Sequence, residues 1–226
     1  MKLCVLFSGG KDSTMALYRG MEEHKIEVLL SMLPASGDSY MYHVPNIQLT
    51  KYSAEALGLP IVLRNTVGKP PQENADLRDA LSEIKDVYGV EGVAAGAIGS
   101  NYQYNIVSNI CKELGLAAYT PYWQKDHEIL IRDAIDAGFD MRMVGVAAAG
   151  LDSSWLGRKL DYGALEELKK IRRKHRIDIG GEGGEYESFV VDGPVFKKRL
   201  EILKARKVWD GVRGELVIED LRLVDK

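Results

Sequence analysis

The chain has 226 residues, of which 46% are hydrophobic and 28% are charged, a composition typical of a globular protein with a sizeable core. Its formal net charge of −3 argues against binding nucleic acid through overall charge. The N-terminus has no signal-peptide pattern and no apolar run reaches membrane-spanning length. We therefore expect a cytoplasmic protein with no membrane partner.

The charge is uneven along the chain. Residues 150–226 contain 17 Lys and Arg against 15 Asp and Glu, whereas residues 1–149 contain 13 against 18. Most of the basic excess lies in residues 169–176, with the sequence Lys-Lys-Ile-Arg-Arg-Lys-His-Arg. This run is interpreted either as a solvated helix face or as a docking patch for an acidic or RNA-rich partner.

Cysteine and histidine give no metal-site pattern. Cys4 and Cys111 form no C-x-x-C pair, and both lie in apolar surroundings that indicate core packing. The histidines lack zinc spacing; they are His24, His43, His127 and His175. The sequence therefore predicts no built-in transition-metal site.

The first predicted strand leads directly into a glycine loop, residues 8–13, with the sequence Ser-Gly-Gly-Lys-Asp-Ser. Residues 3–7 are continuously apolar, as in a strand buried on both faces of a parallel sheet. A helical pattern follows the loop. Glycine lets backbone N–H groups approach a phosphate, and a helix N-terminus favours negative charge. The loop therefore predicts an anion site; the alternative is a glycine-rich turn that binds nothing.

The spacing of the residues in this loop shows which class of nucleotide-binding motif it resembles. It is too short for a Walker A loop, and the dinucleotide-binding pattern G-x-G-x-x-G is absent. The hexapeptide instead resembles the S-G-G-x-D-S signature of the N-type ATP pyrophosphatases. Those enzymes cleave ATP between the α and β phosphates, so the resemblance implies that this chain binds and splits ATP.

Strands and helices are expected to alternate over the first two thirds of the chain. After the first helix, strands are predicted at residues 26–33, 60–63, 92–95, 117–119 and 141–146, with helices at 46–58, 74–88, 102–114 and 126–138. Asn46 is expected to cap the second helix. This alternation predicts an α/β fold, a doubly wound Rossmann-like parallel sheet with helices on both faces. The ligand crevice is expected at the carboxyl ends of its strands.

The pattern changes beyond Gly150. A loop at residues 151–158 and a helix at 162–175 precede a glycine-rich acidic element, residues 182–187, with the sequence Glu-Gly-Gly-Glu-Tyr-Glu. Two later strands, from residue 200 and at 215–218, are predicted to pair antiparallel. We therefore predict two domains: a nucleotide-binding domain at 1–149 and a smaller C-terminal α+β substrate-binding domain at 150–226.

Taken together, the motifs of this chain resemble the diphthine–ammonia ligase family of N-type ATP pyrophosphatases, which has the adenine nucleotide alpha hydrolase-like fold. The resemblance spans nearly the whole chain, and the acidic element is its most specific mark. The matching stretches, in chain order, are residues 8–13, 42–46, 96–98 with Ser100, Tyr102 and Gln103, 151–158, and 182–187. One departure is that Tyr104 and Asn105 follow Gln103, where family members often carry Arg.

The resemblance implies a reaction, a partner and a cofactor. ATP activates the carboxylate of diphthine, a modified histidine of translation elongation factor 2, as an acyl-adenylate, and pyrophosphate leaves. Ammonium supplies the nitrogen that displaces AMP and forms diphthamide, because adenylation has given the carboxylate a good leaving group. Mg²⁺ is implied as the cofactor of ATP.

The nucleotide site is expected around the glycine loop. Ser8, Gly9, Gly10, Lys11, Asp12 and Ser13 are predicted to bind the phosphates, and Met32, Leu33, Gly96 and Ile98 to contact the adenine. Lys11 is expected to neutralise charge on the departing pyrophosphate. Asp12 is interpreted as a magnesium ligand or as a helix-start carboxylate. Met32 and Leu33 are equally well interpreted as core residues.

The acidic element is the second predicted centre. Glu182, Glu185 and Glu187 are candidate catalytic residues, and candidate substrate-binding residues are Tyr102, Gln103, Gly183, Gly184, Glu185 and Tyr186. Acidic and aromatic walls attract a trimethylammonium group such as that of diphthine, with Tyr122 and Trp123 as further candidate walls. A carboxylate here could also hold ammonium or accept its proton. The alternative is an exposed acidic loop.

Two other functions stay open at the level of sequence. One is a tRNA-modifying ATP pyrophosphatase, although Cys4 in a buried strand is a poor thiolating residue. The other is a non-catalytic ATP-binding module of the universal-stress type. Lys2 stands where an N-terminal-nucleophile glutaminase has Cys, so free ammonium is the expected nitrogen source. Homo-oligomerisation also stays open.

Overall fold

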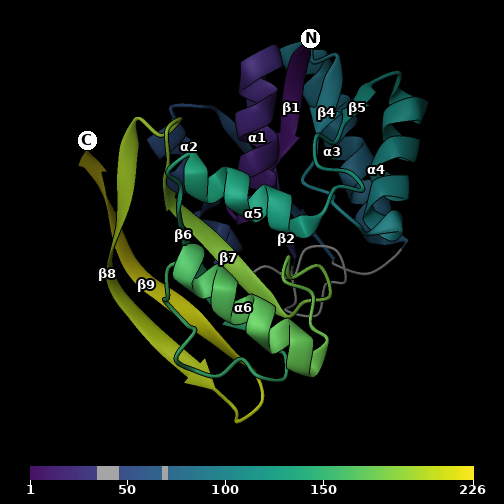
Figure 1. Cartoon of the computed structure of the whole chain (residues 1–226). Coiled ribbons are helices and arrows are strands. Elements are labelled where there is room, and N and C mark those ends of the chain that lie inside the picture. The colour runs from purple at the N-terminus through teal and green to yellow at the C-terminus, as the bar shows by residue number, and fades with distance from the viewer. Residues whose placement is uncertain (35–45, 68–70) are drawn as a thin grey trace.

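The computed structural model describes residues 1–34, 46–67 and 71–226, so residues 42–45 of the second family motif lie outside the described residues. A five-stranded parallel sheet has the order β3-β2-β1-β4-β5. Its strands are β1 (Lys2–Leu6), β2 (Lys25–Pro34), β3 (Ile61–Thr66), β4 (Gly92–Ala94) and β5 (Ala117–Tyr119). The order changes direction between β1 and β4, and there the carboxyl ends of both strands open toward the second sheet (Figure 1).

Helices cover both faces of this sheet, as predicted. They are α1 (Lys11–Glu23), α2 (Thr50–Leu57), α3 (Gln72–Tyr88), α4 (Asn101–Leu114) and α5 (His127–Asp136). A further helix, α6 (Tyr162–His175), lies beside α5. Alternate residues of β1 enter two cores: Leu3 and Val5 pack with α1, α2 and α5, whereas Cys4 packs with α3 and α4. Burial on both faces explains why this strand has no polar residue between Leu3 and Leu6.

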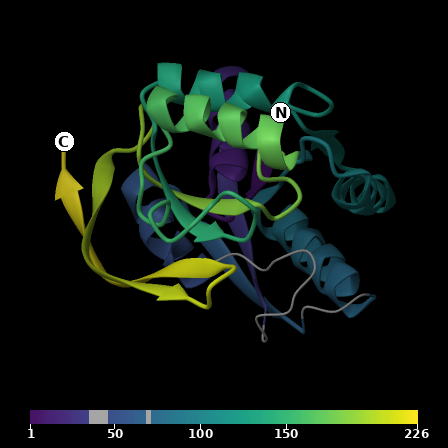
Figure 2. The ribbon, with the colours of Figure 1, turned by 60° about the horizontal axis from the view of Figure 1, so that its bottom comes forward.

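A second, four-stranded sheet has the order β7-β6-β9-β8 and is antiparallel. Its strands are β6 (Asp140–Val146), β7 (Tyr186–Asp192), β8 (Lys198–Trp209) and β9 (Gly214–Asp225). The predicted antiparallel pair at the C-terminus is therefore confirmed. α5 and α6 lie side by side over this part of the molecule, and β8 and β9 form a long ribbon along one edge (Figures 1 and 2).

The prediction that residues 141–146 continue the parallel sheet is wrong. β6 pairs antiparallel with β7 and β9 and belongs to the second sheet. An apolar run of this length fits a buried strand in either sheet, and the partner of β6 lies about 40 residues further along the chain, so local pattern does not determine the pairing. The division between residues 149 and 150 stays a prediction.

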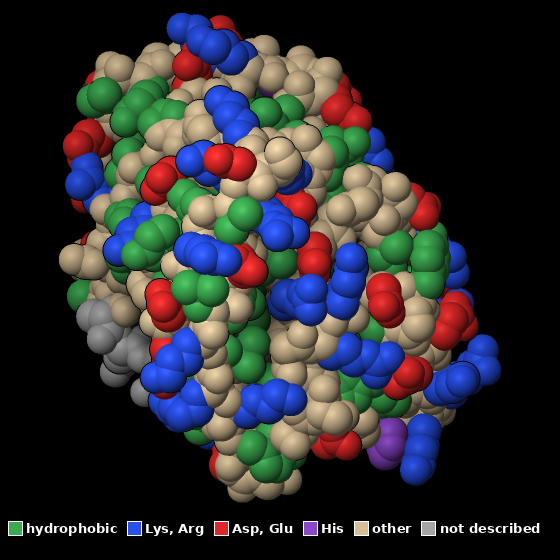
Figure 3. Space-filling model, turned by 90° about the vertical axis from the view of Figure 1, so that its left-hand side faces the viewer, with side chains coloured by type: hydrophobic (Ala, Val, Ile, Leu, Met, Phe, Trp, Pro, Cys, Tyr) green, Lys and Arg blue, Asp and Glu red, His purple; other side chains and the backbone are tan. Residues whose placement is uncertain are grey.

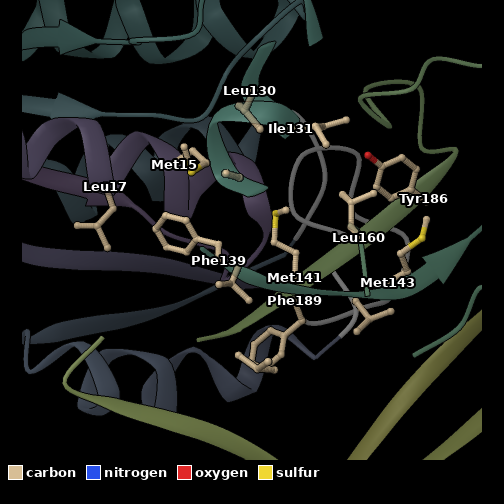
Figure 4. Packing of buried hydrophobic residues seen from close by; sticks show 14 of the residues in the cluster. Met15, Leu17, Leu130, Ile131, Phe139, Met141, Met143, Leu160, Tyr186 and Phe189 are labelled. Atoms are coloured by element: carbon tan, nitrogen blue, oxygen red, sulfur yellow. The ribbon is translucent and has the colours of Figure 1, made fainter. Parts of the chain in front are cut away.

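The two sheets share one core. Met15 on α1, Ile131 on α5, Met141 on β6 and Phe189 on β7 belong to a single cluster of buried hydrophobic side chains (Figure 4). Because this cluster joins the start of α1 to β7, the glycine loop and the acidic element are held by the same packed interior.

The predicted cap at Asn46 is also wrong. Asn46 is 8% exposed and has a left-handed backbone (φ 65°), and its side chain makes no cap hydrogen bond. Instead its Nδ2 donates to the Leu216 carbonyl at 2.9 Å and its Oδ1 accepts from the Ile218 N–H at 3.0 Å. A short 3-10 turn at Ile47–Leu49 precedes α2. The buried amide is used to bind β9, because burying it without both bonds would be costly.

None of the helices within residues 1–34, 46–67 and 71–226 has the length and hydropathy of a membrane-spanning helix.

Candidate active site

The glycine loop lies between β1 and α1, at the point where the strand order reverses. Gly9 has a φ of +77°, which favours glycine, and Gly10 precedes the first residue of α1. No side chain caps α1. Its first backbone N–H groups therefore have no capping acceptor, although the Lys11 N–H donates to Ser188 Oγ. A glycine turn before an uncapped helix N-terminus is a geometry that favours an anion; that this loop binds phosphate stays a prediction.

β7 of the second sheet packs directly on this loop. The Val190 N–H donates to the Gly9 carbonyl at 2.8 Å, and the Lys11 N–H donates to Ser188 Oγ at 3.0 Å. A Cβ on Gly9 would lie 3.1 Å from the Phe189 ring, and one on Gly10 would lie 3.1 Å from the Ser188 carbonyl. The two glycines therefore accommodate β7 as well as the turn.

The two serines of the loop are close together. Ser8 Oγ lies 3.1 Å from Ser13 Oγ, the Ser8 N–H donates to Ser13 Oγ at 3.2 Å, and Ser13 Oγ donates to the Gly10 carbonyl at 3.2 Å. The loop thus closes on itself through hydroxyl groups. Hydroxyl groups can turn their hydrogens toward an anion, so the pair suits a phosphate site.

Lys11 is enclosed by the site rather than exposed on it. It is 3% exposed, its Nζ lies 2.9 Å from Asp12 Oδ2, and its charge lies 5.1 Å from the centre of the Tyr186 ring. Burial by itself would lower the pKa of Lys11, but the Asp12 carboxylate and the Tyr186 hydroxyl outweigh it, and the pKa of Lys11 is raised. Lys11 therefore stays a cation within the wall of the site.

Asp12 has the chemistry of a metal ligand. Its Oδ1 is fully enclosed and has no hydrogen-bond partner among the described residues, although the whole side chain is 36% exposed. Burial raises the pKa of Asp12, Lys11 opposes this, and the nearby Glu182 adds to it. No group of three His, Cys, Asp or Glu suited to a metal occurs in the described residues, but Mg²⁺ usually needs only one or two carboxylates beside substrate phosphates. The residues present therefore fit Mg²⁺.

Glu182 of the acidic element binds the loop that follows β4. Its Oε1 accepts from the Ile98 N–H at 3.0 Å and from the Gly99 N–H at 2.9 Å. This carboxylate therefore joins the acidic element to the second loop of the nucleotide crevice.

Glu185 is committed to its own turn. Its Oε1 accepts from the Asp178 N–H and its Oε2 from the Gly183 N–H, both at 2.9 Å. Gly183 and Gly184 are exposed, and Gly184 has a φ of +80°. Two backbone hydrogen bonds to one carboxylate hold the Gly-Gly turn in shape.

Tyr186 and Glu187 are the first two residues of β7, the first buried and the second half-buried. Tyr186 is 1% exposed, and its hydroxyl donates to the Ile179 carbonyl at 2.7 Å. The side chain of Glu187 makes no hydrogen bond or ion pair with any described residue. Burial raises the pKa of Glu187 to about 7, with Lys11 opposing the shift and Asp12 adding to it. Of the three glutamates, Glu187 is thus the one whose oxygens are not occupied by backbone N–H groups.

The raised pKa of Glu187 predicts a pH-dependent stability. Between pH 4.5 and 7 the folded protein keeps a proton that the unfolded chain has lost, so the free energy of unfolding falls as the pH rises. The full loss, above pH 7, is about 3 kcal/mol for a shift of this size. Urea denaturation at pH 4.5 and 8 measures it. The neutral variant Glu187→Gln is expected to lack this fall; an equal fall in wild type and variant would contradict the prediction.

The residues predicted to contact adenine lie on two strand ends. Met32, at the end of β2, is 3% exposed and belongs to the core formed with α3 and α4, whereas Leu33 is half-buried. A Cβ on Gly96 would lie 2.6 Å from the Asp12 carbonyl carbon, so the close approach at Gly96 is made by the first turn of α1. Ile98 is 1% exposed. Their adenine contacts stay a prediction.

Three further residues of the predicted substrate site lie in or near the loop that follows β4. Tyr102 is 40% exposed and Gln103 donates its N–H to the N-cap Ser100 at 3.3 Å, both at the start of α4. Trp123 stacks on Tyr104 at 4.0 Å.

Tyr122 lies between helices instead of beside the acidic element. It is 2% exposed, its hydroxyl donates to Asp133 at 2.9 Å, and it accepts from Arg19 Nε at 3.1 Å. Tyr122 therefore joins α1 to α5, and its ring faces Lys125 Nζ at 5.2 Å; a role as a wall for the cation of the substrate stays a prediction.

A histidine–carboxylate pair was missed in the sequence. His127, the first residue of α5, places Nδ1 2.7 Å from Asp178 Oδ1 and 2.6 Å from Oδ2. Its Nε2 lies 3.1 Å from the position of a Cβ on Gly99, on the side of the nucleotide crevice. The two residues are 51 positions apart, and no local pattern links them. Ser188, by contrast, directly follows the acidic element and could have been included with it.

An open cleft of about 720 Å³ lies on the other side of His127. It is bounded by the segment before α5, the last turn of α6 and the turn of the acidic element. Its lining residues are Gln124, Lys125, Asp126, His127, Arg172, Arg176, Ile177, Asp178 and Glu185. The acidic element thus contacts the nucleotide crevice through Glu182 and Glu187, and this cleft through Glu185.

Comparison with known proteins agrees with this arrangement. A family model described as the diphthamide synthase N-terminal domain matches residues 1–118, and one described as the diphthamide synthase C-terminal domain matches residues 126–224. A diphthine–ammonia ligase from Rattus norvegicus is 35% identical over 223 residues, covering 89% of this chain and 83% of that protein. The one from Homo sapiens is 35% identical over 221 residues, with 88% and 82% covered.

A fungal relative and a solved structure are also similar. The diphthine–ammonia ligase of Schizosaccharomyces pombe is 34% identical over 233 residues, covering 96% of this chain and 38% of that longer protein. A crystal structure described as a predicted subunit of tRNA methyltransferase from Methanocaldococcus jannaschii has a TM-score of 0.45 and 17% identity, covering 86% of this chain and 100% of that one. This structural similarity is too weak to support a function. The sequence matches, which span both sheets, show that this chain belongs to the diphthine–ammonia ligase family.

Proposed function

We propose that this protein uses ATP and ammonium to amidate diphthine, the modified histidine of translation elongation factor 2, through an acyl-adenylate. The names of its relatives support the reaction. The observation that supports it most directly is the contact between the glycine loop and β7, where the Lys11 N–H donates to Ser188 Oγ at 3.0 Å. This contact supports a single site in which the predicted phosphate loop and the Glu187 carboxylate act together, as an activating and amidating enzyme requires.

In the first step a carboxylate oxygen of diphthine attacks the α-phosphorus of ATP, and the bond to the β-phosphate oxygen breaks. Pyrophosphate leaves, and the carboxylate becomes a mixed anhydride with AMP. Ser8, Gly9, Gly10 and Ser13 bind the departing phosphates through N–H and hydroxyl groups. Asp12 is the residue that would hold Mg²⁺, which supplies positive charge to the phosphates when bound. Lys11 adds positive charge from within the wall.

In the second step ammonia attacks the carbonyl carbon of the adenylate, AMP leaves, and the nitrogen loses a proton. Glu187 accepts this proton in our proposal. It lies beside the glycine loop, and its oxygens have no partner among the described residues, whereas Glu182 and Glu185 are held by backbone N–H groups. We assign Glu182 and Glu185 to shaping the site rather than to proton transfer.

The acceptor side chain is proposed to reach the adenylate from the cleft beside Glu185. Its trimethylammonium group is a permanent cation, which we place against the carboxylates of Glu185, Asp178 and Asp126. Basic side chains line another part of the same cleft. Tyr102 and Gln103 stand at the start of α4, on the β4 side of the crevice. Membership in the diphthine–ammonia ligase family favours this function over tRNA modification and over ATP binding without catalysis.

Incubation with ATP tests the proposal. We expect one AMP, one pyrophosphate and one amide per factor when the purified protein is incubated with diphthine-bearing elongation factor 2 and ammonium. Nucleotide analysis measures the AMP and pyrophosphate, and the mass of the modified peptide measures the amide. Omitting the factor or the ammonium should abolish amide formation. ATP that is bound but never cleaved, or AMP formed without any amide, would contradict the proposed function.

A further inference from the structure

The arginines of this protein fall into two groups. Most form ion pairs with carboxylates, among them Arg19 with Asp133 and Arg158 with Glu167. Among the described residues, the arginines without an ion pair or a side-chain hydrogen bond are Arg172, Arg173, Arg176 and Arg199. Three of these four lie within five residues, at the C-terminal end of α6. Basic residues are favourable at a helix C-terminus, but this does not account for guanidinium groups that all lack a carboxylate partner.

Two of the three line the cleft. Arg172 is on the last turn of α6 and Arg176 directly follows the helix, and both line the 720 Å³ cleft together with Glu185. Arg176 ends the helix with a left-handed backbone, φ 58°, and its N–H donates to the Arg172 carbonyl at 2.8 Å. The position of the pair is therefore fixed by the end of the helix.

The carboxylates of the cleft are already satisfied by other groups. Asp178 accepts from the Gly180 N–H at 2.8 Å and pairs with His127, and Glu185 accepts two backbone N–H groups. None of them forms an ion pair with Arg172 or Arg176, although all line one cleft. The two guanidinium groups thus keep their donors available to a ligand that brings its own negative charge.

The surface of β8 and β9 provides a contrast within the same molecule. Figure 3 shows Lys and Arg side chains mixed with Asp and Glu over the face that these strands occupy. Lys204 and Arg206 both pair with Glu219, and Arg222 pairs with Glu201. Among the arginines of β8 and β9, only Arg199 lacks a carboxylate partner in the described part of the chain, whereas three unpaired arginines gather at the end of α6.

We propose that Arg172 and Arg176 bind carboxylates of an acidic segment of the protein acceptor and so dock it with the residue to be amidated facing Glu185. The inference rests on the proposed function and names the docking surface of its substrate. Carboxylates fit the planar guanidinium fork in a bidentate manner. A protein is favoured over RNA because one or two carboxylates of a peptide can meet the two guanidinium groups and stay clear of Asp126, Asp178 and Glu185 in the same cleft, whereas every nucleotide of an RNA brings a further phosphate. The net charge of −3 on the chain also disfavours RNA.

The test removes the two guanidinium groups without disturbing the helix end. In the double variant Arg172→Gln/Arg176→Gly, glutamine keeps high helix propensity and glycine adopts the positive φ of the original residue. Arg199→Gln is the matched control, because Arg199 is exposed and unpaired but lies at the start of β8, outside the cleft. Thermal midpoints of all proteins check that folding is unchanged.

The double variant is expected to raise KM for elongation factor 2 by about tenfold, as for the loss of charge-assisted hydrogen bonds. kcat at saturating factor and KM for ATP should stay within about twofold of wild type, since neither group belongs to the nucleotide site. The decrease of kcat/KM with added salt should be weaker in the double variant than in wild type. Arg199→Gln should behave as wild type in every measurement.

If the double variant changes KM for the factor no more than Arg199→Gln does, the docking proposal is overturned. The proposed function still holds in that case, provided that the wild-type protein forms the amide. If wild type forms no amide, direct binding of the factor to wild type and double variant still tests docking, and equal affinities would overturn it. Single-stranded RNA is the competing ligand. RNA binding that is lost in the double variant, with an unchanged KM for the factor, would overturn the proposal in favour of RNA.

Discussion

Asp12→Asn is expected to slow pyrophosphate release at least about 100-fold, the size of effect seen when one charge-stabilising group is lost from a reaction centre. The midpoint of thermal unfolding is expected to shift by no more than about 3 °C. The reason lies in the two oxygens of Asp12. Oδ1 has no partner among the described residues, so its role is toward a ligand, whereas asparagine can still accept the bond that Lys11 Nζ gives to Oδ2.

Two measurements support the interpretation of this variant. Pyrophosphate release is followed at increasing magnesium concentration, and the variant should need more magnesium to reach its maximum rate if Asp12 holds the ion. Asp86→Asn is the control, because Asp86 is an exposed carboxylate on α3, on the far side of the parallel sheet from β7. A fall in stability as severe as the fall in rate would show that Asp12 serves the fold and not the reaction.

Glu187→Gln is expected to lower amide formation by a factor of about 100 to 1,000, the range for removal of a general base. The first half of the reaction should survive, because glutamine fills the same space and Glu187 binds no phosphate in the proposed mechanism. Isotope exchange between pyrophosphate and ATP, measured with the factor present and ammonium absent, reports that first half separately. It should stay within about threefold of wild type.

The pH dependence of the Glu187→Gln variant gives a second readout. Raising the pH increases the share of free ammonia and of hydroxide that can take the proton, so the variant should recover part of its rate in alkaline buffer. Glu55→Gln, an exposed change on α2, should leave both half-reactions as they are. Loss of pyrophosphate exchange together with amide formation, and no recovery at high pH, would remove Glu187 from the role of proton acceptor.

The sequence determined the family and most of the architecture. The hexapeptide at residues 8–13 specifies its own conformation, because its glycines and its place between a buried strand and a helix leave few alternatives. The alternation of apolar strands with amphipathic helices determined the parallel sheet, since both signals are local and periodic. Predicted elements agree closely with observed ones, as for residues 117–119 in β5 and 162–175 in α6.

Only the tertiary structure decided what depends on contacts between distant parts of the chain. β6 joins the second sheet because its partners β7 and β9 lie 40 or more residues away. Gly96 accommodates the first turn of α1, and His127 meets Asp178 across 51 residues. Periodicity contains no information about such pairings, since a buried strand or a histidine looks the same whichever partner it finds.

The same limit explains the acidic element. Its three glutamates are alike in sequence, and each could have been the reactive one. In the folded protein Glu182 and Glu185 accept hydrogen bonds from backbone N–H groups, whereas Glu187 is half-buried near Lys11 and Asp12, with its pKa raised to about 7. The sequence therefore determined that carboxylates gather near a phosphate loop. The tertiary structure alone decided which of them accept backbone hydrogen bonds and which does not, because that depends on where the backbone places its donors.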